Sequence, residues 1–253
     1  MSNSHFNIVI PARYESTRLP GKVLLDIVGK PMIQHVWERS LESGADAVVI
    51  ATDNDRVADV AVSFGADVCT TSDTCNSGTD RVAEVCATRN WPGDTIVVNV
   101  QGDAPLIQPA SISNVADLLN IHAEASIATA CVTIKSLEEY LDPNVVKVVL
   151  SKHGQALYFS RASIPAGGHG AKVESDWPSS WRHLGLYAYR VEALQQLSAT
   201  QPCELEITER LEQLRAMWLG MQIQVLVDEN TRGPDVDTAE DLQKVKDILL
   251  AGC

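Results

Sequence analysis

A basic segment interrupts an otherwise acidic chain. The 253 residues include 20 Lys and Arg against 33 Asp and Glu, a formal net charge of −13. Directly after a short apolar run, the segment Pro11–Lys22 carries Arg13, Arg18 and Lys22 against a single acid, Glu15. A polyphosphate needs cations and main-chain N–H groups held in a loop. The segment is therefore predicted to bind phosphate, and the alternative is a solvated basic loop.

A second polar cluster opens a helix at residues 76–81. Its sequence NSGTDR offers small side chains and the N–H groups of a helix N-terminus, and Arg81 adds a charge. The alternative is an ordinary N-cap, in which Ser77 or Thr79 bonds the first turn of the helix.

Two carboxylates stand at the ends of predicted elements. Asp103, in the sequence QGDAP, follows a strand and would lie beside the basic loop if the two strands are neighbours. Mg²⁺ takes hard oxygen ligands, few of them from protein and the rest from phosphate and water. Asp237, before the last helix, is an available partner. A tight turn at Asp103 and helix capping by Asp237 are the alternatives.

Unbroken apolar strands alternate with helices over about the first two-fifths of the chain. Strands without polar alternation are buried on both faces, so the pattern indicates a parallel sheet covered by helices. Ligands of such sheets bind outside the carboxyl ends of the strands, where the basic loop and Asp103 both belong. The predicted strands are 6–10, 47–51, 67–70 and 95–100, and the predicted helices are 31–43, 57–64 and 79–87.

After about residue 125 the pattern becomes richer in strands. We expect one mixed α/β domain over residues 1–253, with a smaller strand-rich subdomain at about 125–190. The polar, glycine-rich loop at 166–180 is a candidate lid. Further strands are predicted at 126–133, 145–150, 155–159, 184–189 and 222–227, and helices at 204–218 and 238–250.

Composition excludes several classes of protein. With 45% hydrophobic and 21% charged residues the chain can build and solubilise a core. The acidic balance disfavours nucleic acids and anionic membranes as partners, and no apolar run approaches the roughly 18 residues of a membrane helix. The six cysteines form no C-x-x-C pair, and the first residues lack the features of a signal peptide. Reduced thiols and a cytoplasmic location are expected.

Taken together, the motifs resemble those of the 3-deoxy-manno-octulosonate cytidylyltransferases, or CMP-Kdo synthetases. The similarity runs from about Ile8 to Leu242. In order, its segments are IPARYESTRLPGK, NSGTDR, VQGDAPLI, NVVKVVL with ALYFSRASIP, RHLGLYAYR, LExxExLEQLR and VDTAEDL. The resemblance implies a Rossmann-like nucleotidyltransferase fold and a homodimer paired through the strand-rich subdomain. It also implies a Mg²⁺-dependent reaction of CTP with the sugar acid Kdo, giving CMP-Kdo and pyrophosphate for lipopolysaccharide synthesis.

The resemblance also implies a role for each candidate residue. Lys22, Asp103 and Asp237 would be catalytic, with the two carboxylates ligating Mg²⁺. Arg161 would meet the sugar carboxylate, since its planar fork can bind both oxygens; the alternative is a surface arginine at a strand end. The nucleotide would contact Ala12, Arg13, Lys22, Ser77, Gly78, Arg81 and Gln101, and the sugar would contact Gln101, Arg161, His183, Tyr187 and Glu209. A hydrogen-bonded structural histidine is the alternative for His183.

One position departs from the family pattern. The family's QGD motif usually continues with Glu-Pro, whereas this chain has Ala104-Pro105. Loss of that anionic side chain would either alter metal binding or mark another sugar acid, such as the 8-amino analogue of Kdo. Two further alternatives are a transferase that uses another nucleotide and a catalytically silent homologue that binds nucleotide.

Overall fold

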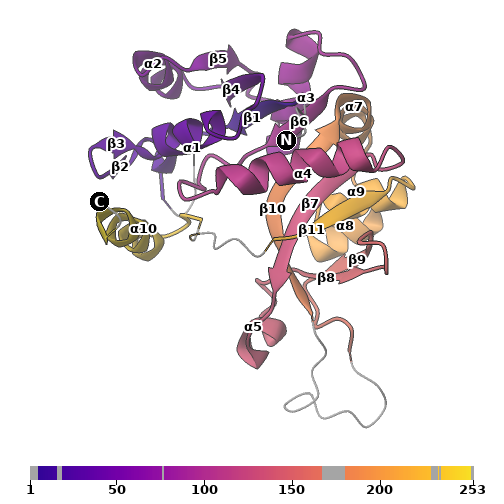
Figure 1. The fold of residues 1–253 in the computed structure, drawn as a ribbon. Helices are drawn as coiled ribbons and strands as arrows, with labels where there is room; N and C mark the ends of the chain where they lie inside the picture. Colours follow the sequence, from indigo (N-terminus) through magenta and orange to yellow (C-terminus); the bar gives the residue numbers. More distant parts are fainter. Residues whose placement is uncertain are drawn as a thin grey trace.

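The N-terminal strands form the parallel sheet that their apolar character predicts. The computed structural model describes residues 5–15, 19–75, 77–166, 180–228, 233 and 235–251. In β1, Ile8 and Ile10 enter the core on one face of the sheet and Val9 enters the core on the other, so both faces are buried. Side by side lie β6 (Ile96–Asn99), β1 (Asn7–Pro11), β4 (Ala47–Thr52) and β5 (Asp67–Thr70) (Figure 1).

The strand-rich segment continues the same nine-stranded sheet. β10 (Trp181–Arg190) runs antiparallel between β6 and β7 (Ile127–Thr133), and β11 (Ile223–Val227) pairs parallel with β7. Along the path β11-β7-β10-β6-β1-β4-β5, β10 runs antiparallel to the other six strands. A hairpin of β8 (Lys147–Leu150) and β9 (Ala156–Ser160) branches from the start of β10.

Helices cover both faces of this sheet. α1 (Met32–Leu41), α2 (Asp55–Ser63) and α4 (Pro109–Ile121) bury Ile33, Val57 and Ile112 against one face. α3 (Gly78–Thr88), α7 (Val191–Ala199) and α9 (Gln213–Trp218) bury Val82, Leu194 and Leu214 against the other. Figure 1 shows α1 and α4 side by side in the layer nearer the viewer. The predicted α/β architecture is confirmed.

The predicted helix at 204–218 is wrong as a single element. It divides into α8 (Glu204–Glu209) and α9, because Arg210 adopts a left-handed conformation with φ 53°. The apolar spacing that predicted one helix says nothing about this backbone reversal. Three helices were not predicted: the longer α4 and α7 and the short α5 (Leu137–Leu141). β10 begins three residues before the predicted strand, because Trp181 pairs with both β7 and β8.

A small third core anchors the C-terminal helix beside the first loop. The short helix η1 (Lys22–Leu24) leads into the hairpin of β2 (Asp26–Ile27) and β3 (Lys30–Pro31), and α10 (Ala239–Ala251) packs against β2 (Figure 1). The buried residues of this third core are Ile27, Met32, Leu106, Val236 and Val245. No helix in the described ranges is long and apolar enough to cross a membrane. The five described cysteines are free thiols; Cys253 lies outside the described residues.

Candidate active site

The loops after β1 and β6 meet at the carboxyl edge of the sheet. These strands are parallel neighbours, so their carboxyl ends lie at the same edge of the sheet. Gly102 allows the close contact, because a Cβ at that position would lie 2.9 Å from the main-chain oxygen of Pro11. The basic loop and the loop that carries Asp103 are therefore adjacent, as the strand order predicts.

Lys22 joins the two predicted metal ligands. Its Nζ lies 2.5 Å from Asp103 Oδ2 and 3.2 Å from Asp237 Oδ1, and it also donates to the carbonyl of Val236 at 3.2 Å. The N–H of Val236 in turn donates to the carbonyl of Asp103 at 2.8 Å. Burial lowers the pKa of Lys22, but hydrogen bonds and charges from Asp103 and Asp237 outweigh it and leave the pKa raised. The ammonium thus stays charged between the two carboxylates.

This pair of carboxylates has the donor chemistry of a magnesium site. Two hard oxygen donors from distant segments converge on one cation, the ammonium of Lys22. No group of three or more His, Cys, Asp or Glu side chains in the described part of the chain could hold a metal ion. A Mg²⁺ ion held by Asp103 and Asp237 would therefore draw its remaining ligands from phosphate and water.

The basic loop is described only in part, because residues 16–18, and with them Arg18, lie outside the described residues. Arg13 donates from Nη2 to the carbonyl of Cys75 at 2.5 Å, which ties this loop to the segment before α3. Ala12 is buried and its N–H donates to Ala51 at 2.8 Å, so that N–H is already used. Gly21, at φ +68°, turns the chain into η1 and so places Lys22.

The start of α3 shows the expected N-cap. Ser77 accepts from the N–H of Asp80 in a capping box, while its hydroxyl donates to Glu212 Oε1 at 3.1 Å. Thr79 donates to the other oxygen of Glu212 at 2.5 Å. Burial raises the pKa of Glu212, although these two hydroxyls oppose the shift. The predicted contacts of Ser77 and Gly78 with a nucleotide stay predictions.

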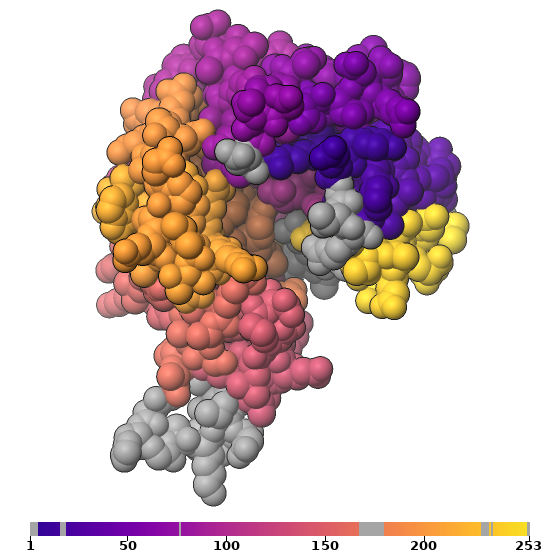
Figure 2. Space-filling view, turned by 180° about the vertical axis from the view of Figure 1, so that it is seen from behind, coloured from indigo at the N-terminus to yellow at the C-terminus, as the bar shows by residue number. Residues whose placement is uncertain are grey.

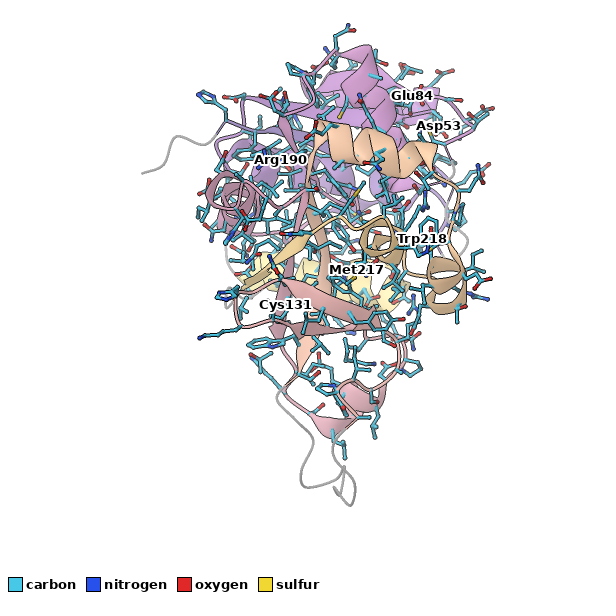
Figure 3. All side chains as sticks on the ribbon, turned by 90° about the vertical axis from the view of Figure 1, so that its right-hand side faces the viewer. Asp53, Glu84, Cys131, Arg190, Met217 and Trp218 are labelled. Atoms are coloured by element: carbon cyan, nitrogen blue, oxygen red, sulfur yellow. The ribbon has the colours of Figure 1, made fainter. Side chains whose placement is uncertain are left out.

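Arg81 lies inside the protein. Its side chain has no exposed surface, Nη2 lies 2.7 Å from Asp53 Oδ2, and Nη1 donates to Thr71. Figure 3 places Asp53 and Glu84 in the upper part of the molecule, by α3 and away from Met217 and Trp218 on α9. In this arrangement Arg81 braces the loops after β4 and β5 against α3, and the nucleotide contact expected of it stays a prediction.

Glu209 supports Arg161 at the end of β9. Glu209 Oε2 accepts from the N–H of Arg161 at 2.9 Å, Oε1 accepts from Ser160 at 2.6 Å, and the Glu209 carbonyl accepts from Arg161 Nε at 2.9 Å. Arg161 Nη1 also donates to the carbonyl of Pro143 at 3.1 Å. Within the described ranges no carboxylate forms an ion pair with the guanidinium of Arg161.

His183 and Tyr187 stand together on β10. His183 Nε2 is 2.9 Å from the Thr129 hydroxyl, and its ring centroid lies 5.0 Å from that of Phe159 and 5.3 Å from that of Tyr187. Burial raises the pKa of Tyr187 well above its usual value, so the phenol stays neutral. His183 thus makes the kind of hydrogen bond that the alternative of a structural histidine requires. Gln101 Nε2 donates to Asn99 Oδ1 at 3.4 Å. Asn99, on β6, lies directly opposite Tyr187 of the neighbouring β10.

Sequence reasoning missed two polar residues, Glu212 and Gln213. Glu212 joins the start of α3 to α9, and Gln213 Nε2 is buried with no hydrogen-bond partner in the described structure. A buried amide without a partner is uncommon in native proteins. Their only sequence signal was their place in the LEQLR motif, which was read as part of one continuous helix.

The space-filling view shows a hollow on one face of the molecule. Figure 2 shows a hollow between the N-terminal segments in indigo, the segments in orange and the C-terminal helix in yellow. A separate cavity of about 470 Å³ lies between α3 and α7, and none of the predicted site residues lines it. Cys75 lines this cavity, and its thiol donates to Glu84. Burial and the nearby carboxylate of Glu84 raise the pKa of Cys75 to about 12, so the thiol stays protonated.

Known proteins resemble this chain over nearly its whole length. A family model described as Cytidylyltransferase matches residues 7–223. The 3-deoxy-manno-octulosonate cytidylyltransferase of Thioalkalivibrio sulfidiphilus is 50% identical, over 97% of this chain and 99% of its own. The 3-deoxy-manno-octulosonate cytidylyltransferase 1 of Actinobacillus pleuropneumoniae serotype 5b is 49% identical, over 97% and 99%.

Solved structures agree. CMP:2-keto-3-deoxy-manno-octonic acid synthetase, solved in complex with CTP, matches with a TM-score of 0.89 and 41% identity, over 98% of this chain and 99% of that one. A UDP-glucose pyrophosphorylase matches with a TM-score of 0.69 at 17% identity, over 98% of this chain and 99% of that one, which shows the shared fold alone.

Proposed function

Because the chain belongs to the 3-deoxy-manno-octulosonate cytidylyltransferase family, we propose that it transfers CMP from CTP to Kdo, giving CMP-Kdo and pyrophosphate. The observation that carries the proposal is the convergence of Lys22, Asp103 and Asp237 at the strand edge beside the basic loop. CMP-Kdo would serve lipopolysaccharide synthesis, and we place the reaction in the cytoplasm.

The chemistry matches these residue types. A hydroxyl of the sugar acid attacks the α-phosphorus of CTP, the bond to the β-phosphate oxygen breaks, and pyrophosphate leaves. Catalysis of such a step rests on positioning and on neutralising the phosphate oxygens. Lys22 and Arg13 supply cationic groups on the basic loop. Mg²⁺ held by Asp103 and Asp237 would neutralise charge on the phosphates and orient them.

At the other end, the sugar acid is held by its carboxylate. Arg161 carries a charge that no described side-chain carboxylate neutralises, and Glu209 fixes its main chain and Nε. A guanidinium held in this way suits the planar carboxylate of Kdo. His183 and Tyr187 provide polar groups for the sugar, and the phenol of Tyr187 is neutral.

Product identification tests the function directly. Purified protein with CTP, Kdo and Mg²⁺ should give CMP-Kdo and pyrophosphate by mass spectrometry, and UTP should replace CTP poorly. The same assay with 8-amino-Kdo tests the alternative sugar. Failure to form CMP-Kdo while another sugar acid or nucleotide turns over would overturn the assignment, and no turnover at all would favour a silent homologue.

The position that departs from the family motif faces the core. Ala104 is 1% exposed and belongs to the same apolar core as Val23 and Ile33. Its side chain is therefore directed into that core, and the alternative of a changed sugar preference draws no support from it. The substitution also leaves Lys22, Asp103 and Asp237 in contact, so the metal site keeps both of its predicted ligands.

Ala104→Glu is expected to lower the free energy of unfolding by about 1–3 kcal/mol, because a carboxylate there loses hydration. The ratio of kcat/KM for Kdo and 8-amino-Kdo should stay within about threefold, well below the tenfold that 1.4 kcal/mol represents. Ala110→Glu, on the exposed start of α4, is the matched control and should leave stability nearly unchanged. A tenfold change in the ratio would show that position 104 shapes the sugar site.

We also propose a homodimer formed through the strand-rich region. In the described residues β9 pairs along its length with β8 alone, which leaves an edge, and Leu157 on that strand is 57% exposed. Leu205 and Ile207 on the adjoining α8 are exposed as well. Large exposed apolar side chains beside an open sheet edge are typical of an association surface.

Sedimentation at micromolar concentration should give a dimer. Leu157→Glu should shift it toward monomer, because a charge would be buried in the interface. Leu250→Glu, at an exposed leucine on α10, should leave the dimer intact. A monomer for the unaltered protein contradicts the proposal, and a dimer that survives Leu157→Glu would place the interface elsewhere.

A further inference from the structure

A lysine is buried at the start of β8 without a carboxylate partner. Lys147 has no exposed surface, and its Nζ donates to three main-chain carbonyls: Asp142 at 2.8 Å, Val145 at 2.6 Å and Arg161 at 2.7 Å. Among the described residues no Asp or Glu side chain forms an ion pair with it. Its hydrogen bonds are satisfied, but its charge is not.

Such a charge is costly for a purely structural residue. Burial lowers the pKa of Lys147, and the nearby charge of Arg161 acts in the same direction, while Asp142 and Glu209 oppose it. A buried charge without a counter-charge destabilises the folded state, and an apolar side chain of similar volume would fill the space at lower cost. The charge and the three N–H donors therefore do more than fill the core: they hold three main-chain carbonyls in place.

The three carbonyls connect the ammonium to Arg161 by two routes. One is the main chain of Arg161 itself, at the end of β9. The other is the turn at 142–145 before β8, where Pro143 accepts from Arg161 Nη1 at 3.1 Å. Glu209 holds the N–H of Arg161 through its carboxylate and the Nε of Arg161 through its carbonyl. Lys147 thus holds the main chain of Arg161 and adds a second positive charge near that residue.

We propose that Lys147 is a positioning residue for the carboxylate of the sugar acid. By fixing the main chain of Arg161 and the turn that receives its guanidinium, it presents the unused edge of that group to the carboxylate, and its own charge strengthens the attraction. The proposal rests on the proposed function, in which Arg161 binds that carboxylate.

Steady-state kinetics of Lys147→Met test this role, since methionine matches the unbranched apolar stem of lysine but lacks the charge and the donors. The KM for Kdo should rise about tenfold or more, while the KM for CTP stays within about twofold, because hydrogen bonds to charged groups carry effects of this size. Lys152→Met, at an exposed lysine in the turn of the same hairpin, is the control and should change neither constant. Equal increases in both KM values would overturn the proposal.

A carboxylate-specific readout separates positioning from loss of structure. The unaltered enzyme should prefer Kdo over its primary amide, which lacks the negative charge, and Lys147→Met should reduce this preference about as much as it raises the KM. Combined with Arg161→Ala, Lys147→Met should add little further loss, since both act on one contact. Full additivity, or an unchanged preference for the carboxylate, would show that Lys147 acts elsewhere.

Folding is checked by circular dichroism and by calorimetric CTP binding. If Lys147→Met does not fold, Lys147→Gln, which keeps two N–H donors without the charge, takes its place. If neither folds, the residue is structural and the proposal is wrong. An unaltered enzyme that makes no CMP-Kdo would instead refute the proposed function, so the two failures are distinguishable.

Discussion

Asp103→Asn is expected to lower turnover by at least about two orders of magnitude while the fold stays intact. Asparagine keeps the shape of the side chain and can still accept from Lys22, but the negative charge that faces the cation is gone. A Mg²⁺ site with one anionic ligand removed binds and orients the triphosphate less well. Pyrophosphate release at saturating CTP and Mg²⁺ measures the effect, with circular dichroism to confirm folding.

Two further variants sharpen this test. Asp237→Asn should have a similar effect, and the double variant should lose far less than the sum, because both carboxylates act on one site. Asp59→Asn, at an exposed carboxylate on α2, is the control and should retain full activity. Near-normal turnover of folded Asp103→Asn would remove this residue from the metal site.

Lys22→Met should reduce kcat/KM for CTP by about two orders of magnitude. The ammonium is the group through which the basic loop meets both carboxylates, and its raised pKa keeps it charged at neutral pH. The substitution removes a cation from the phosphate site and leaves Asp103 and Asp237 to repel each other. Initial rates over a range of CTP concentrations at fixed Kdo give the result.

The control for this variant is Lys30→Met, on β3. Lys30 pairs with Glu38 at 2.7 Å and takes no part in the predicted site, so its loss should leave kcat/KM for CTP within about twofold. Arg13→Ala should also impair CTP use, although less than Lys22→Met, because Arg13 reaches Cys75 and not the two carboxylates. An unchanged kcat and KM for CTP in Lys22→Met would exclude the basic loop from phosphate binding.

Local patterns carried the prediction furthest in the first half of the chain. Unbroken apolar strands can be recognised without knowing their partners, and parallel neighbours must end at the same edge. That logic correctly brought Lys22 and Asp103 together. Asp237 is remote in sequence; its place before the last helix made it an available partner, and the family resemblance implied that it joins Asp103 in the metal site.

What could not be predicted depends on backbone conformation and on distant partners. The spacing of hydrophobic residues does not depend on the backbone conformation of a single residue such as the left-handed Arg210, so it could not predict the break between α8 and α9. Arg81 lies beside a helix N-terminus, and its ion pair with Asp53, in the loop after β4, could not be predicted from the local sequence. The partner groups of Lys147 are main-chain carbonyls, which no side-chain pattern reveals.

The order of the strands bears on how the protein is made on the ribosome. β6 must wait for β10 as its second neighbour, and β7 must wait for β11, so the middle of the sheet closes only after most of the chain has emerged. Asp237 follows later still and docks through Val236 onto Asp103. Contacts this distant in sequence form slowly. A chain released before Asp237 would keep the basic loop and Asp103 but lack the second carboxylate, so with the role proposed for Asp237 an incomplete product is expected not to consume CTP.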